Sequence, residues 1–100
     1  MSTEPQPKTI QIPELLEQPT YNYLAHNVSE VKRQLRKRLS AMTDAQIILG
    51  IASQANKGLI KYGKLIDDNT DFDADTYCNE EIFDALVYQA YKEVQANQNQ

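Results

Sequence analysis

The sequence predicts an all-α fold, with a short N-terminal helix or arm followed by three main helices. Apolar residues recur at spacings of three and four in three long segments, which is the period of an α-helix. Asn27 and Thr43 can each cap a helix, and each is followed three residues later by a glutamate or a glutamine. The segment from Asp67 to Asp75 is too acidic, and too poor in β-branched residues, to form a strand.

The composition is that of one small globular domain. A chain of 100 residues has a modest core, so an oligomer interface would help to stabilise it. The hydrophobic fraction is 41%, and no apolar run approaches the ~20 residues that a membrane span needs. The first residues are polar and do not resemble a targeting peptide, so we expect a cytoplasmic protein.

Residues 1–27 are predicted to form an N-terminal arm that contains one short helix. The apolar residues of this helix are followed by Pro19, which we expect to end it, and Pro13 suits its first turn. Tyr21 and Tyr23 are then expected in an extended segment that packs on the same chain or on a partner chain.

Residues 28–95 are predicted to form the helical domain, and its first helix should begin at Asn27. The side chains of Asn27 and Glu30 are expected to form a capping box. One stripe of the helix is apolar and consists of Val28, Val31, Leu35, Leu39 and Met42.

Basic residues occupy the other side of this first helix, at Lys32, Arg33, Arg36 and Lys37. They are interpreted either as a solvated face or as a surface for a charged partner. Nucleic acid is not the favoured partner, because the net charge is −4 and no glycine-rich or aromatic platform accompanies the run. The segment from Leu65 to Gln100 carries nine acids and the single base Lys92, so self-association of basic and acidic ends is a further interpretation.

The second and third helices are expected to form an antiparallel hairpin. Thr43 and Gln46 predict a capping box, and Gly63 fits the left-handed residue just beyond the end of the second helix. The third helix should begin near Thr76, with Cys78 as a small buried residue on its inner face. Residues 96–100 are expected to be a frayed polar tail.

Three carboxylates at the start of the last helix are candidate metal ligands: Glu80, Glu81 and Asp84. Residues three and four apart share a helix face, and closely spaced carboxylates repel one another unless a cation joins them. Oxygen ligands of this kind suit Mg²⁺ or Mn²⁺. The alternative is that these acids are present only because negative charge is stabilising near the positive N-terminal end of the helix dipole.

A calcium loop is a second interpretation of the same region. Counting from Asn69 places aspartates at the third, fifth and seventh positions and Glu80 at the twelfth, but Ala74 stands where the sharp turn requires glycine.

The residues Lys57-Gly-Leu-Ile-Lys-Tyr-Gly63, followed by an acidic linker and Glu80-Glu-Ile-Phe-Asp-Ala-Leu-Val-Tyr88, resemble the C-terminal half of small phage-type MazG-like proteins. These are all-α nucleoside triphosphate pyrophosphohydrolases, in which two acidic groups hold Mg²⁺ against the triphosphate. Glu81 and Asp84 match the second acidic group. The preceding helix carries Gln54, Lys57 and Lys61 where the first group would stand.

The resemblance implies a Mg²⁺-dependent enzyme acting on nucleotides, with Lys57 and Lys61 near the phosphates. The same lysines can also be ordinary solvated residues. The alternative function is a non-catalytic phage or bacterial accessory protein, which binds a nucleotide or a host protein through charged helical surfaces. In both cases we expect a homo-oligomer, a dimer or higher, and a phage-encoded chain would act in the host cytoplasm.

Overall fold

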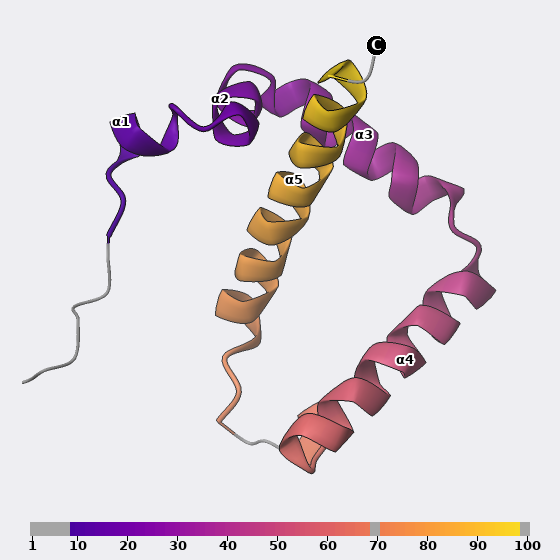
Figure 1. Cartoon of the computed structure of the whole chain (residues 1–100). Helices are drawn as coiled ribbons and strands as arrows, with labels where there is room; N and C mark the ends of the chain where they lie inside the picture. Colours follow the sequence, from indigo (N-terminus) through magenta and orange to yellow (C-terminus); the bar gives the residue numbers. More distant parts are fainter. Residues whose placement is uncertain (1–8, 69–70, 99–100) are drawn as a thin grey trace, which may run out of the picture.

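The computed structural model describes residues 9–68 and 71–98, and it confirms the all-α prediction (Figure 1). The helices in these ranges are α1 (Ile12–Leu15), α2 (Pro19–His26), α3 (Val28–Ala41), α4 (Asp44–Tyr62) and α5 (Ala74–Gln98), with a 3-10 turn at Ile66–Asp68. Within the same ranges no residue belongs to a strand. None of the described helices has both the length and the apolar character that crossing a bilayer requires.

The prediction of an extended segment after Pro19 is wrong, because Pro19 is the first residue of α2. Proline suits the first position of a helix, since the amide hydrogen that it lacks would have no partner within the helix there. Tyr21 and Tyr23 are therefore helical, and both are half-buried. Pro13 lies in the first turn of α1, as predicted.

The start of α3 is predicted correctly, but the capping box at Asn27 is not formed. The side-chain amide of Asn27 donates instead to the carbonyl oxygen of Tyr23, at 2.8 Å. Because α2 ends directly before α3, its last carbonyl groups lack helical partners and lie within reach of Asn27. The carboxylate of Glu30 is bound by other residues of α3.

Both ends of α4 follow the local signals in the sequence. The Thr43 hydroxyl accepts a hydrogen bond from the backbone amide of Gln46 at 3.1 Å, and the Thr43 amide donates to the Gln46 side chain at 2.8 Å. Gly63 has a φ of 74° and donates its amide hydrogen to the carbonyl of Leu59. The predicted capping box and left-handed end are therefore confirmed.

The start of α5 is fixed by Asp73. Its carboxylate accepts hydrogen bonds from the Thr76 hydroxyl at 2.6 Å and from the Thr76 backbone amide at 3.2 Å. These bonds lower the pKa of Asp73, the side-chain bond most strongly. The helix begins two residues before the predicted start and continues to Gln98.

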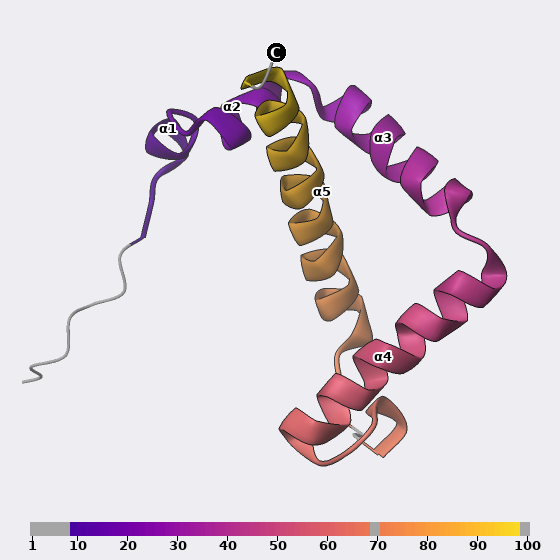
Figure 2. The same ribbon diagram turned by 45° about the vertical axis from the view of Figure 1, so that its right-hand side comes forward.

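The core lies where α2 and α3 meet the second half of α5. Val31 of α3 and Ala90 of α5 are fully buried there, and Gln89 is 8% exposed. Figure 2 shows α5 running up to this junction, with α2 and the start of α3 beside its C-terminal end. The segment predicted as an N-terminal arm thus contributes α2 to the core.

The helix α4 belongs to none of the principal helix pairs in contact. It leads away from α3, and α5 returns in the opposite direction, so that the two helices form an open V (Figures 1 and 2). The radius of gyration is 17.6 Å, whereas a compact chain of this length has about 13 Å. The accessible surface is 8839 Å², against about 5,800 Å² for a compact monomer of the same mass.

Large apolar side chains of α4 and of the first half of α5 (residues 74–86) are exposed as a result. Their positions are Ile48, Leu49, Ile51, Leu59, Ile60, Tyr62, Tyr77, Ile82 and Phe83. The prediction that Cys78 is buried is wrong, since it is exposed. Helical spacing places Cys78 on the same stripe as Ile82, and both residues are exposed.

We expect Val31→Ala to lower the free energy of unfolding by about 2 kcal/mol, because it removes apolar contacts at the fully buried junction. Urea unfolding followed by circular dichroism measures this change. The control is Ser40→Ala on the exposed side of α3, which should change stability by less than about 0.5 kcal/mol. Equal effects of the two substitutions would contradict this assignment of the core.

Candidate functional site

An apolar groove lies between α3 and the middle of α5, with a volume of about 530 Å³. Its floor consists of Leu35, Leu39 and Met42 from α3 and of Ile82 and Leu86 from α5. Its rim carries Lys32, Arg36 and Arg38. The groove therefore combines an apolar floor with a positively charged edge.

The basic rim is the structural outcome of the amphipathic pattern in α3. The predicted partner surface included Lys32, Arg33, Arg36 and Lys37. Lys32 and Arg36 line the groove, whereas Lys37 lines a second hollow of about 450 Å³ on the other side of α3. Arg38, in both hollows, donates its Nε hydrogen to the side-chain oxygen of Gln89 at 3.1 Å.

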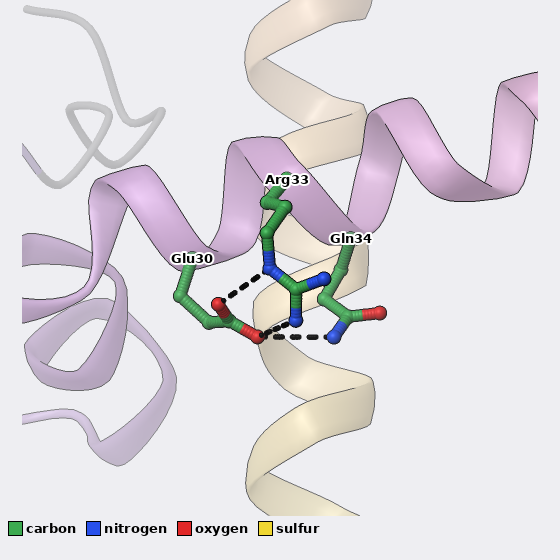
Figure 3. Close-up of polar contacts among 3 residues, drawn as sticks. All are labelled: Glu30, Arg33 and Gln34. Atoms are coloured by element: carbon green, nitrogen blue, oxygen red, sulfur yellow. Dashed lines mark hydrogen bonds and ion pairs between the residues drawn. The ribbon is translucent and has the colours of Figure 1, made fainter.

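Arg33 is paired within its own helix (Figure 3). Its guanidinium donates to both carboxylate oxygens of Glu30, at 2.8 and 3.0 Å, and the Gln34 amide donates to the same carboxylate at 3.0 Å. Hydrogen bonding by Arg33, and then by Gln34, lowers the pKa of Glu30 to about 2. The charge of Arg33 is thus balanced locally, whereas Lys32, Arg36 and Arg38 of the groove rim have no carboxylate partner among the described residues.

A second carboxylate, Glu93 of α5, lies near this pair. Its Oε2 atom is buried, and no described group donates a hydrogen bond to it. Burial raises the pKa of Glu93, and the nearby charge of Glu30 raises it further, while Arg33 opposes this effect. Burial, together with Glu93 and Glu30, also raises the pKa of Tyr23 in α2.

This polar cluster, defined as Tyr23, Glu30, Arg33, Gln34 and Glu93, was not predicted. Glu93 falls at helical spacing from Gln89 and Ala90. An acid on the inner stripe of α5 was therefore the sequence feature that could have indicated this cluster. Only the tertiary contacts show that the neighbours of Glu93 come from α2 and α3.

The predicted metal ligands lie on the exposed first half of α5. Glu80, Glu81 and Asp84 are all exposed, and they are well suited chemically to Mg²⁺. Within residues 9–68 and 71–98, however, no three side chains of histidine, cysteine, aspartate or glutamate come together in an arrangement that would hold a metal ion. The described part of the chain therefore does not by itself assemble such a cage around these carboxylates.

The predicted phosphate-binding lysines lie on α4, away from these carboxylates. Lys57 and Lys61 are exposed, and the Nζ atom of Lys61 is 5.2 Å from the ring centroid of the adjacent Tyr62. The chain does not bring them together with α5 through any of its principal helix contacts.

The calcium-loop interpretation falls partly outside the described residues, because Asn69 does so. Of the remaining positions, Asp75 and Glu80 are within α5, and the carboxylate of Asp73 binds Thr76. Asp73 therefore has a structural role at the start of the helix.

Comparison with models of known families finds no match for this chain, and searches of curated proteins and of solved structures find none either.

We expect Glu93→Gln to raise the free energy of unfolding at neutral pH by about 1 kcal/mol, because it removes a buried charge that has no hydrogen-bond donor. A raised pKa in the folded state means that folding favours the protonated acid. Stability from this group is therefore present below the ordinary value of 4.5 and is lost as the pH rises through the raised value.

Thermal unfolding of both proteins between pH 4 and pH 7 measures this dependence. The advantage of Glu93→Gln should be smallest at the acid end and grow towards neutral pH. Glu17→Gln, at an exposed position of the chain, is the matched control and should show no such trend. A constant difference across the range would contradict the role assigned to Glu93.

Proposed function

We propose that this chain is a non-catalytic interaction protein that acts as a homo-oligomer, assembled through the apolar face of α4. The observation that carries the proposal is the exposure of this face. Ile48 is 64% exposed and Ile51 is 58% exposed, although helical spacing places both on one stripe. Apolar surface of this extent on a soluble helix is typical of an interface with another protein.

An isolated helix gains little stability from hydrogen bonding alone. In proteins, most of the stability of a helix comes from packing its apolar face against another element. The principal packing in this chain does not include α4. A partner chain would provide the packing that α4 lacks.

The charges of α4 favour a second copy of the same helix as this partner. Asp44 begins the helix, and its only other charged residues, Lys57 and Lys61, lie in its second half. An antiparallel pair of α4 helices would place the acid of each copy near the lysines of the other, with opposed helix dipoles. Two α4 and two α5 helices would then form a four-helix arrangement, in line with the expected dimer.

We expect the double substitution Ile48→Glu and Ile51→Glu to abolish assembly. Placing carboxylates in an apolar interface should raise the dissociation constant by more than about 100-fold. Sedimentation velocity over a range of micromolar concentrations measures this change, and circular dichroism checks that the chain keeps a high helix content.

The matched control is Ser53→Glu with Gln54→Glu, which adds the same charge to the polar side of α4. This variant should assemble like the unmodified protein. Assembly that persists with glutamates at positions 48 and 51, or a protein that is monomeric throughout, would contradict the proposal.

A second candidate function is the hydrolysis of nucleoside triphosphates to monophosphates and pyrophosphate. It is favoured by the likeness of residues 57–63 and 80–88 to MazG-like proteins, and by the exposure of Glu81 and Asp84 on one face of α5. In an oligomer, Lys57 and Lys61 of one copy would be available to nucleotide phosphates beside the carboxylates of another copy.

This second candidate predicts pyrophosphate release when the protein is incubated with deoxynucleoside triphosphates and Mg²⁺. Glu81→Gln and Asp84→Asn should each lower the rate by more than about tenfold, which corresponds to about 1.4 kcal/mol of transition-state free energy. Glu14→Gln on α1, at an exposed position outside the proposed site and interface, is the control and should leave the rate unchanged. Absence of release, together with no heat of Mg²⁺ binding in calorimetry, would rule the activity out.

A further inference from the structure

The groove between α3 and α5 requires an occupant with apolar side chains and negative charge. Leu39 and Met42 of its floor are exposed, and its rim is basic. Within the described residues, the only ion pair is between Arg33 and Glu30, so Lys32 and Arg36 have no described carboxylate partner. An apolar helix flanked by acids has the complementary chemistry.

The first half of α5 has these properties. It presents the apolar side chains of Ile82 and Phe83, both exposed, and it carries Asp75, Glu80, Glu81 and Asp84 without a single basic residue. By comparison, α4 has one acid, at its first residue, and so lacks the negative charge that the rim requires.

The chain cannot place this segment in its own groove. Ile82 and Leu86 already form one wall of the groove. Asp75, Glu80 and Glu81 precede both residues in the sequence, on the part of α5 that leads away from its junction with α3 (Figure 2). The acidic half of α5 must therefore come from another molecule if it is to meet the basic rim.

We propose that the groove receives the first half of α5 from a second copy of the chain, in an antiparallel two-fold dimer. A two-fold axis near Ile82 and Leu86 makes the contact reciprocal, because these residues belong both to the groove wall and to the helix that enters the partner's groove. The first half of each α5 then lies beside the basic residues of the partner's α3.

The charge distribution supports this antiparallel arrangement over a parallel one. Lys32 and Arg36 line the groove beside the middle of α5, and three of the acids, Asp75, Glu80 and Glu81, precede this point on the helix. Antiparallel packing brings these opposite charges together twice, once in each half of the interface. Parallel packing would place the acidic halves side by side, and like charges at that distance repel.

The exposed surface of the whole chain, 8839 Å², is about 3,000 Å² larger than that of a compact monomer of its mass. Stable interfaces bury about 800 Å² per partner, so the open shape of the chain is compatible with such a dimer. The inference rests on the proposed function, since both require a homo-oligomer. It goes further by naming the surfaces that meet and the charges that select them.

Charge reversal tests the inference in two variants. The groove variant is Lys32→Glu with Arg36→Glu, and the helix variant is Glu80→Lys with Glu81→Lys. Alone, each variant places like charges in both halves of the interface, so its dissociation constant for self-association should rise at least about tenfold. Mixed in equal amounts, they have opposite charges in both halves and should form a heterodimer.

Sedimentation velocity at low and high salt measures these outcomes. Lys37→Glu with Lys92→Glu, in the second hollow on the other side of α3, is the matched control for the groove variant, and it should leave both the groove contact and the α4 contact intact. We expect dimers in the mixture of the two variants but not in either variant by itself. Added salt should weaken the assembly of the unmodified protein. Unchanged assembly of both variants, or no recovery in the mixture, would overturn the inference.

A second measurement needs no substitution. Cys78 lies on the first half of α5 and is exposed in the single chain. Its alkylation by a maleimide should slow at concentrations where the dimer forms, because the partner covers this segment. Constant reactivity in an assembled protein would contradict the inference. If assembly then depends on Ile48 and Ile51 but not on the reversed charges, the proposed function stands and this inference fails.

Discussion

The contact of α3 with the second half of α5 is the interaction on which the rest of the structure depends. Val31 and Ala90 are buried at this crossing, and Arg38 binds Gln89 across a sequence separation of 51 residues. Because α2 joins the same junction, the burial is concentrated at one end of α5. The first half of α5 and all of α4 lie away from this junction and do not pack on other helices to a comparable extent. Much apolar surface is therefore exposed.

Electrostatics divides the same structure into two parts. Around the junction, Glu30 balances Arg33, and the burial of Glu93 gives that acid a raised pKa. Lys32 and Arg36 are left with their charges unbalanced, while the first half of α5 has an excess of acid. The bases lie on α3 and the acids on α5, and the proposed dimer would bring these two parts together between molecules.

Features of the helix ends that depend only on residues close in the sequence could be predicted, whereas features that depend on the packing of other helices could not. The Thr43 capping box and the left-handed Gly63 need only neighbours within four residues, and both were predicted. Pro19 suits either the end of one helix or the start of the next, and the choice followed from the packing of α2 on α5. Asn27 failed as a cap because a nearby carbonyl of α2 competed for its amide.

For the candidate site, the amphipathic pattern of α3 predicted which residues form the basic face, but not that α5 would complete a groove beside it. Glu93 was missed for the same reason, because its surroundings come from α2 and α3. The metal-ligand prediction for Glu80, Glu81 and Asp84 stays a prediction, since the described residues show these acids exposed and without a third partner arranged around an ion.

The long separation between the two sides of the core also has a consequence for synthesis. A ribosome adds about 5 to 20 residues per second, so α3 is complete several seconds before its partner residues on α5 have been made. During that interval the apolar stripe of α3 and the whole of α4 are present without the helix that forms the core. The nascent chain is therefore most prone to aggregate, or to be bound by a chaperone, before α5 leaves the ribosome, whatever the stability of the finished protein.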